Sequence, residues 1–443
     1  MALCAYSSPR RPALIAYDYQ DGSVLWTSPM EDLQGFPGRI PGGIVMASMK
    51  VAGKPPKNYV FAVNPAEFVA YDAEGKRLWK RANNQVVIEA PQGIGLPVSL
   101  SFNDSKELVC ATTGGWVVKL SPIDGHTIDA YYMSTSVDVE GQLHRGAFFT
   151  WKSPIVIGDV MYVLAEFAPD VYGSLPHLIS PVHIIRIELV QRGAAGRSQK
   201  IKPLSQPTRV GDRCSDRVLI GLNRGRGSPP ACVAPDGRVL IFAPAHALRD
   251  GRLFPTVAGV EDEGGMLTRR WLSVLEVPRG DSVHSAPALH GRSGSLFVTT
   301  SRNIFLFRDV RSLEGSVPSP QPIASEKMVS FATSPRVARV AVGSPFAVTF
   351  DGDRDDIVAY TNFRAVSNAG QSYSFLGAFS VPASGPVRPR PLWNRPLAIT
   401  LAGSPAPGPG TVGQVALFRY DGEAGRSTGL IVNTVFTGTY IMK

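Results

Sequence analysis

A short phrase that occurs twice near the start of the chain limits the possible folds more than any other feature. It reads LIAYDYQDGSVLW from Leu14 to Trp26 and FVAYDAEGKRLW from Phe68 to Trp79. Each copy has an apolar run, a turn that contains Asp and Gly, and a second apolar run that ends in Trp. A phrase that recurs within one chain indicates a repeated structural unit.

The rest of the chain divides into units of the same kind, at a loose spacing of roughly 50–75 residues. In each unit, short β-branched or aromatic runs are bounded by Gly, Asp, Asn or Pro, which predicts four strands joined by turns. No long apolar stripe at helical spacing competes with this interpretation. The predicted units are residues 40–89, 90–149, 150–225, 226–281, 282–331 and 332–399.

A single four-stranded sheet cannot bury both of its faces, but sheets packed radially around an axis can. The repeat therefore predicts an all-β propeller in one domain, residues 1–443. The first phrase contains only a third and a fourth strand, so residues 12–29 are expected to share a closing blade with residues 400–443. That arrangement gives seven blades. If the C-terminal TYIMK is a third strand, eight blades are the alternative.

Composition and charge narrow the class of protein. The chain has 443 residues, 44% of them hydrophobic, as expected of a globular protein with a large core. The net charge of +9 favours anionic partners, but no basic motif is interleaved with aromatic residues, so no nucleic acid is expected. No apolar run is long enough to predict a membrane-spanning helix. The start lacks a secretory signal, which as written predicts the cytoplasm; a true start further upstream would allow export.

The four cysteines are widely spaced and lack the Cys-x-x-Cys pattern of zinc sites. Cys214 and Cys232 would be able to form a disulfide only if their loops meet, which the sequence leaves open.

The two phrases and their tryptophans resemble the pyrroloquinoline-quinone-type repeat of the quinoprotein dehydrogenase-like propellers. The resemblance implies a propeller, an architecture shared with the WD40 and YVTN repeats. It also implies that the tryptophans of the fourth strands pack between neighbouring blades. These residues are Trp26, Trp79, Trp271 and Trp393.

This superfamily includes dehydrogenases that bind the quinone with calcium, and non-enzymatic scaffolds such as a lipoprotein that assembles outer-membrane β-barrels. The chain has no adjacent cysteines of the methanol dehydrogenase type and no Cys-x-x-Cys-His haem motif. We therefore expect a monomeric, non-enzymatic scaffold that binds a protein partner, without the quinone. The alternative is a quinone- and calcium-dependent oxidoreductase, and a sugar-binding module or lyase is a third possibility.

Two charged segments are candidate sites. The stretch FDGDRDDIVAY contains Asp351, Asp353, Asp355 and Asp356. Closely spaced carboxylates are typical of calcium-binding loops, but also of a solvated hairpin turn. The second segment is a basic rim that would bind anions, or else a solvated loop between blades. Its residues are Arg209, Arg213, Arg217, Arg224 and Arg226. No catalytic residue can be assigned, because the histidines show no metal-ligand spacing and no nucleophile motif occurs.

Overall fold

The structure is a computed structural model in which part of the chain is described. The described residues are 2–7, 12–18, 23–30, 43–49, 56–90, 94–139, 141–171, 175, 180–193, 196–198, 200–203, 207–213, 229–278, 283, 287–300, 303–311, 319–323, 337–351, 356–367, 372–399, 412–422, 425–434 and 438–442. In this part the fold is all-β apart from one 3-10 turn, η1 (Asn83–Gln85), which confirms the predicted fold class.

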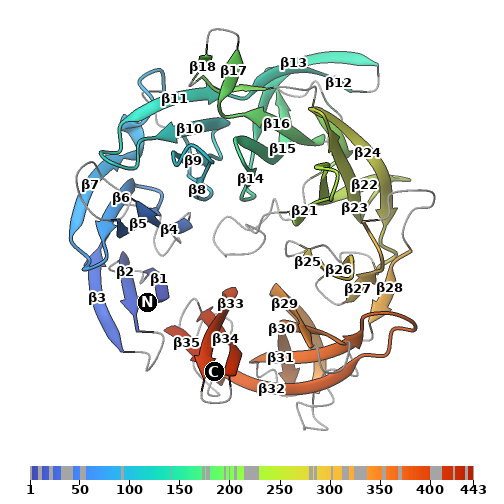
Figure 1. The fold of residues 1–443 in the computed structure, drawn as a ribbon. Helices are drawn as coiled ribbons and strands as arrows, with labels where there is room; N and C mark the ends of the chain where they lie inside the picture. The colour runs from blue at the N-terminus through green and yellow to red at the C-terminus, as the bar shows by residue number, and fades with distance from the viewer. Residues whose placement is uncertain are drawn as a thin grey trace. The chain divides into compact units, whose positions relative to one another are not determined.

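The chain forms two compact units, and each is described by itself. The first contains Met1–Cys214 and Glu263–Thr268, and the second contains Ser215–Asp262 and Arg269–Lys443. Figure 1 shows the strands in chain order. In the described residues they form eight antiparallel sheets of three or more strands, here called the first to the eighth sheet in chain order, and one small hairpin.

The first unit contains three simple sheets in which each strand pairs with the next. Their strands are β1 (Ala2–Ser7), β2 (Pro12–Tyr17) and β3 (Val24–Pro29) in the first sheet; β4 (Gly43–Met49), β5 (Lys57–Val63), β6 (Glu67–Asp72) and β7 (Arg77–Ala82) in the second; and β8 (Ser101–Phe102), β9 (Leu108–Ala111), β10 (Trp116–Leu120) and β11 (Thr127–Tyr132) in the third. The second and third sheets are the predicted four-stranded unit.

The fourth sheet has seven strands. They are β12 (Ser134–Val139), β13 (Gln142–Phe149), β14 (Ile155–Ile157), β15 (Val160–Pro169), β16 (Val182–Glu188), β19 (Lys202–Pro203) and β20 (Thr208–Gly211). The hairpin of β17 (Gln191–Gly193) and β18 (Gly196–Ser198) is separate. Both β14 and β13 pair with β15, one after the other, and β12 pairs with the outer side of β13.

The second unit continues the pattern with two regular four-stranded sheets and a longer one. The strands are β21 (Ala231–Val233), β22 (Val239–Arg249), β23 (Arg252–Glu263) and β24 (Met266–Val274) in the fifth sheet, whose last strands also include residues of the first unit; β25 (Ala288–His290), β26 (Ser295–Thr299), β27 (Ile304–Phe307) and β28 (Gln321–Ile323) in the sixth; and β29 (Val337–Asp351), β30 (Asp356–Ser367), β31 (Ser372–Pro382) and β32 (Arg390–Ile399) in the seventh.

The two ends of the chain differ from the predicted shared blade. The eighth sheet contains β33 (Val412–Gly422), β34 (Gly425–Thr434) and β35 (Gly438–Met442), so the C-terminal TYIMK segment does form a third strand. At the other end, β1 pairs with β2 along its whole length. Each end therefore has three strands, whereas one shared four-stranded blade requires two from each. The strand that sequence reasoning missed is β1, because it precedes the first recognisable phrase.

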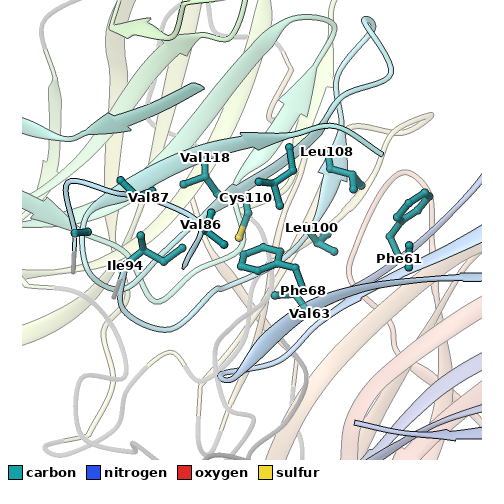
Figure 2. Packing of buried hydrophobic residues seen from close by; sticks show 13 residues of the cluster. Phe61, Val63, Phe68, Val86, Val87, Ile94, Leu100, Leu108, Cys110 and Val118 are labelled. Carbon is teal, nitrogen blue, oxygen red and sulfur yellow. The ribbon is translucent and has the colours of Figure 1, made fainter. Parts of the chain in front are cut away.

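Alternating side chains along each strand connect one sheet to the sheets before and after it. In β6, Val69 and Tyr71 pack with residues of the first sheet, whereas Phe68 and Ala70 pack with Cys110 and other residues of the third. Figure 2 shows the second of these clusters, in which Phe68 and Cys110 lie among buried valines and leucines. All of these side chains are almost fully buried, as expected for strands covered on both faces.

Candidate functional site

The contacts between consecutive sheets, here called seams, carry most of the distinctive side chains. At the first seam, Trp26 of β3 pairs across the sheet with Ala16 and reaches the second sheet. Its Nε1 donates a hydrogen bond of 2.9 Å to the carbonyl of Ala73, directly after β6. The indole covers Gly75 so closely that a Cβ on this glycine would lie 2.6 Å from the ring. Gly75 has φ +83°, so glycine suits both the backbone and the contact.

The second seam repeats these two contacts one sheet further along the chain. Trp79 of β7 donates from Nε1 to the carbonyl of Pro122 at 2.9 Å, and its ring lies against Gly125, which has φ +71°. The other two tryptophans are less comparable. Trp271 stacks between Phe242 and Phe307, with ring centroids 6.2 Å away on each side. Trp393 lies in β32, but its side chain is outside what the structure describes.

At the third seam, charged groups stand where the first two have an indole. The cross-strand register that pairs Trp79 with Ala70 pairs Asp129 with Lys119 here. The fully buried Lys119 ammonium donates to Glu107 at 3.1 Å and to the carbonyl of Leu189 at 2.7 Å. The Asp129 carboxylate accepts the backbone N–H of Ile201 in the fourth sheet. The hydrogen bonds satisfy charges that would be costly to bury alone.

The seam between the sixth and seventh sheets uses the same kind of acceptor with another donor. Arg308 follows β27 and donates from Nη1 to the carbonyl of Ala383 at 2.5 Å. Ala73, Leu189 and Ala383 are each the first residue after the third strand of a four-stranded sheet or its equivalent. At these three seams a backbone carbonyl at the same position is therefore met by Trp, Lys or Arg, whereas at the second seam the acceptor is Pro122, the second residue after β10.

The acidic segment lies largely outside the described residues. Asp353 and Asp355 are not described, and the side chain of Asp351 is not described either. The register pairs Asp351 with Asp356 at the ends of β29 and β30, so the segment connects two adjacent antiparallel strands. Calcium binding there stays a prediction. Among the described residues, no group of three or more His, Cys, Asp or Glu side chains is arranged to hold a metal ion.

The basic rim is described only in part. Arg209 forms an ion pair of 2.6 Å with Asp212, which neutralises much of its charge, and Arg213 is half-buried. Arg217, Arg224 and Arg226 lie outside the described residues. Anion binding by this rim stays a prediction.

His183 lies directly beside Arg209, because the two residues are register partners in β16 and β20. It is 2% exposed, and its ring meets Phe148 edge-on with the centroids 5.3 Å apart. Burial is the main cause that lowers the pKa of His183 to about 4, and the positive charge of Arg209 acts in the same direction. The histidine is therefore neutral at neutral pH.

The surroundings of His290 and Cys110 suit a structural role better than a reactive one. His290 accepts a hydrogen bond from the backbone N–H of Ser293 through Nδ1, which closes the turn before β26, while His284 is not described. Cys110 and Cys232 are free thiols, and burial raises the pKa of Cys110 to about 12, so this thiol is unreactive. Cys214 lies outside the described residues, so whether it pairs with Cys232 stays open, as in the sequence analysis.

Two features were missed by sequence reasoning. One is the hairpin of β12 and β13, whose apolar and polar residues alternate around a turn that contains Gly141. The other is Gln321, the register partner of Leu306, which takes the position that Trp79 has in the second sheet. The available signal was the missing tryptophan of the sixth unit.

No family model and no curated protein matches the chain. No described helix is both long and apolar enough to cross a membrane. Among solved structures, the chain is similar to BamB from Moraxella catarrhalis, with 11% identity, a TM-score of 0.46, and coverage of 100% of this chain and 96% of that one. It is similar to the C-terminal WD40 domain of Sif2, with 8% identity, a TM-score of 0.47 and coverage of 99% and 92%. A third similar structure is the quinohemoprotein alcohol dehydrogenase ADHIIG from Pseudomonas putida HK5, with 11% identity, a TM-score of 0.44 and coverage of 89% and 67%.

Proposed function

We propose that this chain is a non-enzymatic β-propeller scaffold that binds a protein partner. The support is the repeat itself, since consecutive four-stranded antiparallel sheets joined by seam contacts are the blade pattern of propellers. We further propose eight blades in one ring. Each end of the chain forms a sheet of three strands, and the described sheets of three or more strands number eight, which is the larger of the two predicted blade counts.

The observation that carries the binding proposal is the lengthening of certain sheets at one end. In a four-stranded meander, the first strand starts at the end where the second strand turns into the third, here called the entry end. In the fourth sheet, β14 pairs with only the first three residues of the ten-residue β15. In the fifth, β21 pairs with only the first three residues of the eleven-residue β22. Both long strands continue toward the entry end, whereas β9 and β26 of the regular sheets have four and five residues.

The fourth sheet adds a surface suited to a partner at this end. Among described strands, β12 pairs only with β13, so its outer edge offers unpaired backbone groups to an added strand. Leu143, the register partner of Asp138 in β12, is 74% exposed. Exposed apolar side chains beside an unpaired strand edge favour protein binding over solvation alone.

A photo-crosslinking amino acid placed at Leu143 in living cells tests the proposal. We expect one discrete protein adduct, absent when the same group replaces Ile88, an apolar residue of the first unit that is even more exposed, at 91%. Adducts of equal yield at both positions, or none at Leu143, would contradict partner binding at the entry end.

The oxidoreductase alternative is tested by thermal unfolding with calcium and with pyrroloquinoline quinone. A ligand that binds only the folded protein raises the unfolding midpoint. We expect no shift with either compound. A shift with calcium that Asp353→Ala removes would establish the acidic loop as a site, and a further shift with the quinone would overturn the non-enzymatic proposal.

A further inference from the structure

The turn between β31 and β32 has the same backbone feature as the turns that receive tryptophan at the first two seams. Gly385 has φ +76°, close to the values of Gly75 and Gly125, and it follows the seam carbonyl of Ala383 as Gly75 follows that of Ala73. The indoles of Trp26 and Trp79 cover Gly75 and Gly125. Among the described residues, nothing lies within 4 Å of a Cβ built on Gly385, which is exposed. A slot that holds an indole at two seams is therefore open at this one.

The reason for the open slot is the residue at the tryptophan position of the sixth sheet. Ile304 and Leu306 of β27 pack toward the seventh sheet, as Phe68 and Ala70 of β6 pack toward the third. Gln321 pairs with Leu306, as Trp79 pairs with Ala70. Gln321 is exposed and has no ring with which to cover Gly385. Arg308 has instead taken over the hydrogen bond to the seam carbonyl.

The charge beside the slot is positive. Among the described residues, Nε and Nη2 of Arg308 meet no acceptor, although both atoms are buried. Because these two atoms are buried, a partner cannot reach them, and the exposed arginines of the turn are the groups that can hold a carboxylate through two parallel hydrogen bonds. Arg388 and Arg390 are exposed in the same turn, and residues 382–390 contain no acidic residue.

We propose that the slot over Gly385 binds an aromatic side chain of a protein partner, flanked by an acidic residue that pairs with Arg388. The aromatic ring would take the place that Trp26 and Trp79 take within this chain, and burial of the ring on the glycine would supply most of the affinity. Since the slot lies at the opposite end of the sheet from the entry end, the proposal does not depend on the partner proposed above.

The test uses 5-fluoroindole-3-acetate as a probe, which combines an indole with a carboxylate, and follows its fluorine resonance on titration with the intact protein. We expect saturable binding that weakens at least tenfold in Gln321→Trp, whose new side chain fills the slot. Gln321→Ala leaves the slot open and should bind like the wild type. Arg388→Met should weaken binding of the acid more than binding of neutral 5-fluoroindole.

Circular dichroism confirms that each variant is folded before its titration is interpreted. Absence of saturable binding to the wild type, or binding that Gln321→Trp leaves unchanged, would overturn the proposal. Equal loss of affinity for the acid and for the neutral indole in Arg388→Met would overturn the role of Arg388. Crosslinking at Leu143 reports on a different surface, so failure of either proposal can be recognised separately.

Discussion

The second and third seams of the first unit both connect consecutive sheets, but one does so with an aromatic ring and the other with charged groups. At the second seam, the indole of Trp79 packs on Gly125 and donates a hydrogen bond from its N–H to the carbonyl of Pro122. At the third seam, Lys119 and Asp129 make charge-assisted hydrogen bonds to the fourth sheet. The two seams therefore share an arrangement of strand, turn and carbonyl, and either dispersion forces or charge can stabilise this arrangement.

The largest expected effect comes from removing one partner of the buried ion pair between Lys119 and Glu107 at the third seam. Lys119→Met should lower the free energy of unfolding by about 3–5 kcal/mol, because it leaves the buried carboxylate of Glu107 without its cation. Denaturant titration measures the change. In the double variant Lys119→Met, Glu107→Leu the charge is removed together with its partner, and most of the stability should return. A double variant as unstable as the single one would show that the ion pair itself holds the seam.

The apolar seam should respond less, because Trp79 is only partly buried. Trp79→Ala should cost about 3 kcal/mol of unfolding free energy, the low end of the range for aromatic truncations. Trp79→Phe keeps a ring on Gly125 but loses the hydrogen bond to Pro122, and should cost about 1 kcal/mol. If the two variants are equally unstable, the hydrogen bond matters more than ring packing.

In the fourth sheet, His183 makes the free energy of unfolding depend on pH, an effect that the contacts at the two seams do not predict. The folded-state pKa of His183 is about 4, below the usual 6.5, because burial disfavours the charged ring. The unfolded chain therefore takes up a proton first as the pH falls, so stability is complete above about 6.5 and is lost progressively toward 4. At pH 5 the loss should be about 2 kcal/mol.

His183→Phe provides the matching control, since it keeps a ring against Phe148 but cannot be protonated. The difference in unfolding free energy between pH 7.5 and pH 5 should shrink by about 2 kcal/mol in this variant. Equal pH dependence in the wild type and in His183→Phe would contradict the assignment.

Sequence reasoning succeeded where a unit carries its own signal. The turn of the second sheet is set locally by Asp72, whose carboxylate accepts the N–H of Lys76, and by Gly75, so the phrase could be recognised without knowledge of its neighbours. The same reasoning missed β1, which has no such turn beside a tryptophan, and the added hairpin of β12 and β13, which interrupts the repeat.

The seam contacts themselves were only partly predictable. The resemblance places tryptophans between sheets, and Trp26 and Trp79 lie there. The use of Lys119 in place of an indole, however, depends on the carbonyl of Leu189, which lies 70 residues further along the chain. No local sequence pattern predicts this contact. The acidic segment and most of the basic rim stay predictions, because their decisive residues lie outside the described part of the chain.

The smallest expected effect is also the most direct test of the seam account. Gln321→Trp places an indole opposite the open Gly385, at the register position of Trp79. If the seams share one geometry, the variant should gain about 1 kcal/mol of unfolding free energy from the newly buried ring surface. Gln321→Leu, which cannot span the slot, should gain less.

The measurement to make first is therefore the difference between the fluorescence emission spectra of Gln321→Trp and wild type, together with the unfolding midpoint of each. The account predicts a blue-shifted contribution from the added indole and a raised midpoint. Emission typical of an indole in water, with an unchanged or lowered midpoint, would contradict the claim that the seventh sheet presents the same glycine and carbonyl to the preceding sheet as the first two seams do.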